Sequence, residues 1–213
     1  MTDSEREKRA AAEEAAQLVE DGMIVGLGTG TTVGFLLPAL ASRGLDLRCV
    51  ATSPQTERSA LELGLPVEPF ETFDRLDLAI DGADQIDSAG WLVKGGGSAH
   101  TREKIVAAAS ERFVVIASSE KLVAVLAPPI PLELLPFGLR ATLRALGPVD
   151  LREVPPSPDG GVIADYRGPI DDPGELAERF DATPGVVEHG LFPPALVSDV
   201  LVARDGRVDR LRF

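Results

Sequence analysis

The chain has 213 residues, 44% hydrophobic and 26% charged, which is enough to bury a sizeable core in one or two domains and excludes disorder as its main state. Its 34 Asp and Glu against 21 Lys and Arg give a formal net charge of −13, which argues against binding nucleic acid or an anionic membrane. It has no apolar stretch of the roughly 20 residues that a membrane span needs, a charged N-terminal segment unlike a signal peptide and one cysteine, Cys49, so we expect a reduced, cytoplasmic protein.

The first part of the chain alternates short apolar strands with helices. The expected elements, in chain order, are helix 4–20, strand 23–27, helix 33–41, strand 48–52, helix 55–63, strand 77–80, helix 101–110 and strand 113–117. Thr31 or Thr32 is expected to cap the helix over 33–41. This alternation implies right-handed crossovers and a mostly parallel sheet with helices on both faces.

After about residue 127 the prolines become frequent and the pattern changes. The order is strand 131–135, helix 137–146, strands 149–154 and 161–166, helix 173–180 and strand 185–189, the β-α-β-β-α-β order of a ferredoxin-like unit. The tail predicts a hairpin over 196–203 and 208–213 that could rejoin the first sheet. The prediction is an α/β fold: a Rossmann-like catalytic domain, 1–127 with 200–213, and a smaller inserted α+β ferredoxin-like domain, 128–199.

A glycine-rich turn at 26–32 lies between a strand and a helix, where backbone N–H groups and the helix dipole favour an anion. Its glycine spacing does not fit a dinucleotide fingerprint, because Val33 stands at the third glycine position. The turn lacks the Gly-Lys-Ser/Thr of an NTPase loop. It therefore predicts a phosphate site, with a tight turn that binds no ligand as the alternative.

Two acids, Asp81 and Asp84, follow the carboxyl end of the strand over 77–80, where open α/β sheets bind ligands. Close carboxylates differ in proton affinity, as acid/base chemistry requires. The alternative is a solvated Asx turn. Asp87 continues the acidic run and raises the possibility of a metal site, although no His or Cys cluster supports a transition metal.

Lys94-Gly95-Gly96-Gly97-Ser98 precedes the helix over 101–110, and three glycines there give a concavity lined by N–H groups. Lys94 adds a mobile positive charge, one of few lysines in an arginine-rich chain. Glu103, in the first turn of that helix, can point back to the concavity or simply complement the helix dipole. His100 is interpreted as a packing or surface residue.

These segments resemble ribose-5-phosphate isomerases of the A type in their order and over nearly the whole chain. The resemblance rests on GLGTGTT, TSPQT, DGADQID, KGGGSAHTREKIVA and PGVVEHGLF, of which KGGG followed by TREKI is the most specific. It implies Glu103 as the proton-transferring base and Lys8 near the phosphate. It further implies a sugar-phosphate site lined by Thr29, Gly30, Thr31, Thr32, Asp81, Gly82, Ala83, Asp84, Lys94, Gly95, Gly96, Gly97 and Lys121.

The chain also departs from the family's pattern. Ser98 and His100 stand where Gly or Ala and Leu are usual, Ser118 stands where Asp is usual, and 157–161 replaces a Thr-Asp-Asn-Gly-Asn stretch. The first three departures leave the expected reacting groups intact, and the last concerns subunit contacts or hinge details.

The implied activity is interconversion of D-ribose 5-phosphate and D-ribulose 5-phosphate through an enediolate, in the non-oxidative branch of the pentose phosphate pathway. Glu103 would move the proton between C2 and C1, Asp81 or Asp84 would assist ring opening, and Lys94 with the glycine N–H groups would stabilise the oxyanion. No cofactor and no metal are expected, and the resemblance implies a homodimer or homotetramer. The alternatives are a non-catalytic sugar-phosphate sensor and an enzyme for another phosphosugar, such as a deaminating isomerase.

Overall fold

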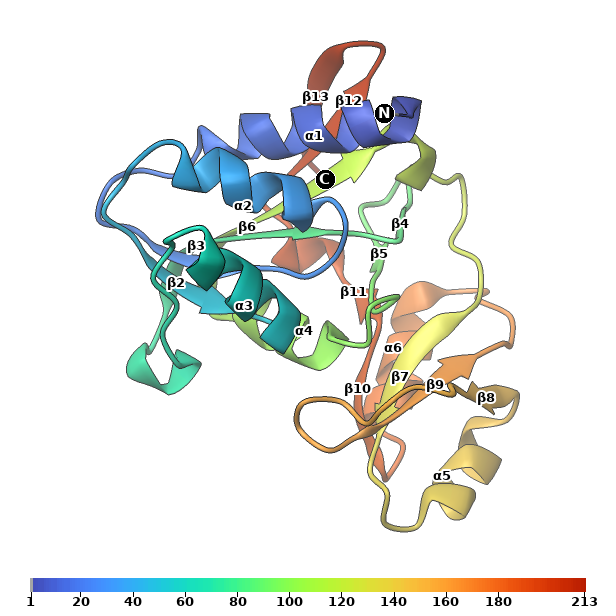
Figure 1. Ribbon diagram of the computed structural model, residues 1–213. Helices are drawn as coiled ribbons and strands as arrows, with labels where there is room; N and C mark the ends of the chain where they lie inside the picture. The colour runs from blue at the N-terminus through green and yellow to red at the C-terminus, as the bar shows by residue number, and fades with distance from the viewer. Residues whose placement is uncertain (1) are drawn as a thin grey trace. The chain divides into compact units, whose positions relative to one another are not determined.

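A computed structural model describes residues 2–213 (Figure 1), and its first element is helix α1 (Asp3–Ala16). The helix begins with a capping box, in which Glu5 N–H donates to Thr2 Oγ1 at 3.2 Å and Thr2 N–H donates to Glu5 Oε2 at 2.7 Å. Its buried face is made only of alanines: Ala11, Ala12, Ala15 and Ala16. Small side chains on this face let the helix pack closely against its neighbours.

The predicted helix over 4–20 is four residues too long. After Ala16 the backbone tightens into bonds from residue i to i−3, for example from Leu18 N–H to Ala15 O at 3.0 Å. Arg43 donates from Nη1 to the carbonyls of Ala16 and Val19. These bonds satisfy carbonyls that a longer helix would have used internally.

The described chain divides into two units. Unit 1 comprises the chain up to Ala83 with 102–122 and 195–213, and unit 2 comprises 84–101 and 123–194. Segment 84–101 thus groups with unit 2, whereas the sequence prediction includes it in the first domain, 1–127 with 200–213. The domains predicted as 1–127 with 200–213 and as 128–199 stay a prediction.

Unit 1 contains a six-stranded sheet, which confirms the predicted α/β class. Its strands are β1 (Ile24–Leu27), β2 (Arg48–Ala51), β3 (Leu76–Gly82), β6 (Ser110–Ser118), β12 (Asp199–Arg204) and β13 (Arg207–Leu211). The order is β13-β12-β6-β3-β1-β2, and every neighbouring pair is parallel except β12 with β13. The C-terminal hairpin therefore rejoins the first sheet, as expected.

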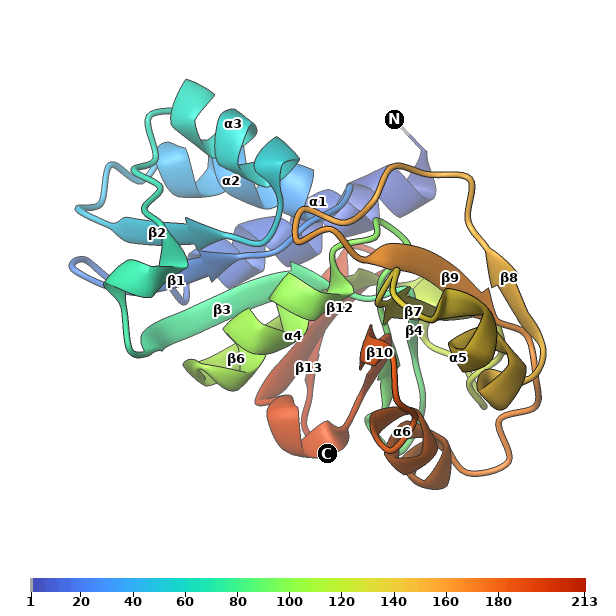
Figure 2. The same cartoon turned by 90° about the horizontal axis from the view of Figure 1, so that it is seen from below.

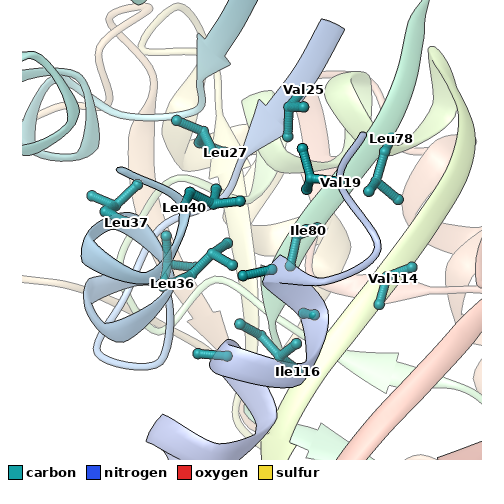
Figure 3. Packing of buried hydrophobic residues seen from close by; sticks show 14 of the residues in the cluster. Val19, Val25, Leu27, Leu36, Leu37, Leu40, Leu78, Ile80, Val114 and Ile116 are labelled. Atoms are coloured by element: carbon teal, nitrogen blue, oxygen red, sulfur yellow. The ribbon is translucent and has the colours of Figure 1, made fainter. Parts of the chain in front are cut away.

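Helices cover both faces of this sheet (Figure 2). Helices α1, α2 (Val33–Ala41) and α3 (Pro54–Glu62) share one core with the strand residues labelled in Figure 3, among them Val25, Leu27 and Ile80. On the opposite face, α4 (His100–Ala108) packs so closely that a Cβ on Gly26 would lie 2.5 Å from Val106 Cγ1. Alternating positions along β1 thus face two different helical layers.

Unit 2 contains the predicted ferredoxin-like order. Its elements are β7 (Ile130–Leu134), α5 (Leu139–Leu146), β8 (Val149–Leu151), β9 (Val162–Tyr166), α6 (Pro173–Asp181) and β10 (Val186–His189). The strands pair antiparallel in the order β10-β7-β9-β8. Leu132, Tyr166 and Phe180 lie in the core of this unit.

A small three-stranded sheet in unit 2 was not predicted. It is formed by β4 (Gln85–Ile86), β5 (Leu92–Val93) and β11 (Leu191–Phe192), in the order β11-β5-β4. Short 3₁₀ turns complete the described elements: η1 (Phe70–Thr72), η2 (Ser119–Lys121) and η3 (Pro194–Leu196). Two-residue strands leave almost no periodic pattern in a sequence, so they escape detection.

Among residues 2–213, no helix has both the length and the apolar character that crossing a membrane requires.

Candidate active site

The glycine-rich turn between β1 and α2 is held by threonines from the next crossover. Thr56 Oγ1 donates to Gly28 O at 2.8 Å, and the Thr29 and Thr52 hydroxyls lie 2.8 Å apart. Through these contacts TSPQT, residues 52–56, holds the turn in place. Gly30 and Thr31 remain exposed at the tip of the turn.

The prediction that a threonine side chain caps α2 at this turn is wrong for Thr32. Thr32 occupies the N-cap position of α2, but its side chain makes no capping hydrogen bond and its backbone is already helical, at φ −71° and ψ −41°. A capping threonine needs an extended backbone to turn its hydroxyl toward the next N–H groups. The first turn of α2 therefore begins without a side-chain acceptor from Thr32.

Asp81, near the end of β3, is 3% exposed, and its carboxylate is fixed by the glycine-rich turn. Its Oδ1 accepts from Thr29 N–H at 3.0 Å and from Gly82 N–H at 2.7 Å. Gly28 is required here because a Cβ on it would overlap the Asp81 carboxylate. Two N–H donors stabilise the negative charge of the carboxylate.

Asp84 begins unit 2 and is exposed, and its partners differ from those of Asp81. Its Oδ2 accepts from Gly96 N–H at 2.8 Å, and its own N–H donates to Val93 O at 2.8 Å. A Cβ on Gly96 would lie 2.9 Å from Asp84 Oδ1. The triple-glycine loop and Asp84 therefore form one hydrogen-bonded group.

Lys94 comes directly before this loop and is 3% exposed. Its Nζ lies 5.4 Å from the centroid of the Phe192 ring, a cation–π contact. The side chain expected to carry a mobile charge is thus buried, and the backbone N–H of Lys94 donates to Gly190 O at 2.8 Å. Gly96 and Gly97 stay exposed beside it.

Glu103 lies in the first turn of α4 and is 5% exposed. A buried carboxylate in that place differs from the solvated acid that usually complements a helix dipole. His100, one turn earlier, is fully buried, and its Nδ1 lies 2.8 Å from where a Cβ on Gly95 would stand. The histidine thus packs against the glycine loop, as the interpretation of a packing residue requires.

Lys8 and Lys121 meet in unit 1 around one carboxylate. The hydroxyl of Ser4, together with the charges of Lys121 and Lys8, holds the pKa of Glu120 below its usual value. The Glu7 carboxylate also accepts from Ser119 N–H at 2.9 Å. Two lysines that lie far apart in the sequence thus act on the same carboxylate, and both are half-buried.

The side chains with metal-ligand chemistry in unit 2 make contacts within the protein. Asp87 Oδ1 accepts from Ala89 N–H and Trp91 N–H, each at 2.9 Å, which makes it the closing residue of a turn. Among residues 2–213, Asp181, Glu188 and His189 bring ligand-type atoms close together. His189 Nδ1 accepts from Leu191 N–H at 3.2 Å, which leaves its proton on Nε2, 3.2 Å from Asp181 Oδ1, where it can be donated.

The chain matches a known family over nearly its full length. The sequence profile of ribose 5-phosphate isomerase A (phosphoriboisomerase A) matches residues 48–207. A ribose-5-phosphate isomerase A of Gluconobacter oxydans is 42% identical over 225 aligned positions, which cover 98% of this chain and 97% of that relative. The chain belongs to the ribose 5-phosphate isomerase A family.

Solved structures of the family agree with this fold over the full length. The isomerase of Neisseria gonorrhoeae superposes with a TM-score of 0.94 at 32% identity and covers all of this chain and 98% of its own. A D-ribose-5-phosphate isomerase in complex with phospho-erythronic acid superposes with a TM-score of 0.93 at 33% identity and covers both chains completely.

Proposed function

We propose that this protein is an aldose–ketose isomerase that interconverts D-ribose 5-phosphate and D-ribulose 5-phosphate. Full-length membership of the ribose 5-phosphate isomerase A family carries the proposal. The residue that fits this chemistry is Glu103, a buried carboxylate in the first turn of α4, the helix that follows the triple-glycine loop. Phospho-erythronic acid, bound by one family structure, carries a carboxylate where an enediolate would carry its negative oxygen.

The reaction requires a base that serves two carbons. Glu103 would take the proton from C2 of the open-chain aldose, so that the electron pair forms the C1–C2 double bond and O1 becomes negative. The same carboxyl group would return a proton to C1 while the O2 proton passes to O1, directly or through a neighbouring carboxylate, which leaves the ketone at C2 and a hydroxyl group at C1. One residue thus moves the proton in both directions of a reversible reaction.

The negative oxygen needs fixed positive groups. We assign this role to Lys94 and the N–H groups of Gly95 and Gly97, because a buried ammonium and glycine N–H groups stabilise an oxyanion without reorganisation. The Gly96 N–H, which donates to Asp84 Oδ2, would instead hold the Asp84 carboxylate beside the substrate. Asp81 and Asp84 would accept and donate protons at the ring and chain oxygens, with Gly82 and Ala83 at the substrate between them in sequence.

The phosphate is a dianion that must enter a protein of net charge −13. Thr29, Gly30, Thr31 and Thr32 would hold it by backbone N–H groups and hydroxyls at the start of α2. Lys121 and Lys8 would add local positive charge, consistent with their convergence around Glu120.

The experiment is a comparison of substrates. Ribose 5-phosphate should be converted to ribulose 5-phosphate, and hexosamine phosphates should not react. Reaction in D₂O should place solvent deuterium at C1 of the ketose, and activity should survive exhaustive chelation because a carboxylate can move the proton without a metal. Binding without turnover would favour the sensor, and turnover of hexosamine phosphates would favour the deaminating isomerase.

Two further properties belong to this proposal. A homodimer or homotetramer is implied by the resemblance and is measured by light scattering. We also propose a cytoplasmic location, which is consistent with a single, buried, free cysteine, Cys49 in β2. Burial, with the charge of Glu68 as a smaller cause, raises the pKa of the Cys49 thiol to about 12 and keeps the thiol protonated.

A further inference from the structure

Arg152, which is not among the expected site residues, contacts the triple-glycine loop within unit 2. Arg152 directly follows β8, and its N–H donates to Ile163 O at 3.0 Å, which continues the pairing with β9. Its Nη1 donates to Gly95 O at 2.8 Å and also lies 3.4 Å from Gly96 O and 3.3 Å from Ser98 Oγ. One guanidinium nitrogen thus contacts three acceptors of the loop.

The direction of this guanidinium is set by Asp165 in β9. Arg152 Nε donates to Asp165 Oδ2 at 3.0 Å, and Arg152 Nη2 donates to Asp165 Oδ1 at 2.6 Å. The two side chains are only 15% and 10% exposed. A two-pronged pair in the protein interior fixes the plane of the guanidinium, so the remaining nitrogen has one direction in which to donate.

The peptide between Gly95 and Gly96 is held by charged groups at both ends. Its carbonyl oxygen accepts from Arg152, and its N–H donates to Asp84 Oδ2 at 2.8 Å. In a trans peptide the C=O and N–H bonds point in opposite directions, so a rotation that loosens one contact also loosens the other. Arg152 and Asp84 are therefore coupled through a single peptide plane.

The loop needs such support because its sequence supplies little. Gly95 has φ +103° and Ser98 has φ +61°, both in the left-handed region, and Ser98 N–H closes the turn onto Gly95 O at 3.0 Å. Consecutive glycines have no side chains to pack and many accessible conformations. The departure at Ser98 from the family pattern places a hydroxyl where Arg152 Nη1 can donate to it.

We propose that Arg152 is a positioning residue for the isomerase reaction: it orients the Gly95–Gly96 peptide, and through it the loop N–H groups and the Asp84 carboxylate, for the step that forms the enediolate. This inference rests on the proposed function. Arg152 acts through the peptide, so its removal should lower kcat more than it raises KM.

The test compares Arg152→Gln with Arg167→Gln. Arg167 is the matched control, since its Nη2 also lies 3.6 Å from Asp165 Oδ2 while its Nε donates to Asp150 Oδ2 at 3.0 Å. We expect Arg152→Gln to lower kcat about 10²-fold with KM changed by less than about threefold, because displacement of oxyanion donors by about 1 Å has effects of that size. Arg167→Gln should stay within about twofold of the parent in both constants.

A second readout needs no substrate. In the free protein, hydrogen exchange of the peptide spanning 94–98 should be faster in Arg152→Gln than in the parent and unchanged in Arg167→Gln, because the loop loses one of its two charged contacts. Added guanidinium ion at tens of millimolar should restore part of kcat to Arg152→Ala. A general loss of packing would produce neither faster exchange confined to 94–98 nor recovery of kcat with guanidinium ion.

The outcomes separate the two proposals. A parent protein that does not convert ribose 5-phosphate refutes the proposed function, whereas the exchange comparison still decides whether Arg152 orders the loop. A folded Arg152→Gln protein with parental kcat, or with parental exchange over 94–98, overturns the positioning role. If Arg152→Gln does not fold, Asp165→Asn and Arg152→Lys replace it, and parental kcat in both would equally overturn the role.

Discussion

A methyl group added at Gly28 tests the role of Asp81 without changing Asp81 itself. A Cβ on Gly28 would overlap the Asp81 carboxylate and lie 2.5 Å from Asp81 Cβ. Asp81 is 3% exposed and follows buried strand residues, so it has little room to retreat. Its carboxylate must then leave the N–H groups of Thr29 and Gly82, at 3.0 and 2.7 Å.

The expected cost follows from these contacts. Overpacking by one methyl group costs about 1–3 kcal/mol, and each lost hydrogen bond to a charged group costs about 1.5–3 kcal/mol. Because the strand can relax in part, we expect Gly28→Ala to lower the free energy of unfolding by about 2–4 kcal/mol. For a chain of this size this lowers Tm by about 4–16 °C. The displaced carboxylate should lower kcat about 10²-fold.

The assay is thermal unfolding together with kcat and KM for ribose 5-phosphate. Gly34→Ala is the control, since a Cβ there meets nothing within 4 Å and Gly34 lies inside α2. It should keep parental activity and stabilise the helix by about 0.5–1 kcal/mol. A Gly28→Ala protein with parental Tm and parental kcat would refute both the close approach and the role of Asp81.

Three further predictions concern charge. Glu103→Gln should lower kcat by at least about 10²-fold with little change in KM, since it keeps the size of the side chain and removes the base; near-parental kcat in a folded variant would contradict the assignment. Lys121→Ala and Lys8→Ala should raise KM more than they lower kcat, as should added salt in the parent, whereas the control Lys104→Ala should change KM by less than about twofold. Unchanged KM in both Lys121→Ala and Lys8→Ala would show that the phosphate is bound elsewhere. The pKa of Asp199 lies far below its usual value because of hydrogen bonds from three arginines. The stability that Asp199 confers is therefore present above the unfolded pKa of about 3.9 and is lost as pH falls. Between about pH 5 and about pH 3, urea unfolding should show a smaller loss of unfolding free energy in Asp199→Asn than in the parent, and equal losses in the two proteins would contradict this.

Local sequence patterns predict the order of the main elements and indicate the segments of the candidate site. Helix 33–41 was predicted with its observed bounds, and the β-α-β-β-α-β order predicted the second sheet. These successes share a cause: helix and strand periodicities, glycines and prolines act over a few neighbouring residues, so they can be recognised locally. The motif KGGG followed by TREKI is equally local.

The partners of these side chains come from distant parts of the chain and are known from the fold alone. Asp81 is fixed by Thr29, which lies 52 residues away, and the glycine loop is held by Arg152, 57 residues from Gly95. The end of α1 likewise depends on Arg43, which comes from beyond the next helix. Nothing within a few residues of these positions indicates their partners, because chain topology sets which groups meet and a directional hydrogen bond forms only once they do. The residue types indicate which chemistry is possible, and the long-range contacts set the geometry of the groups that carry it out.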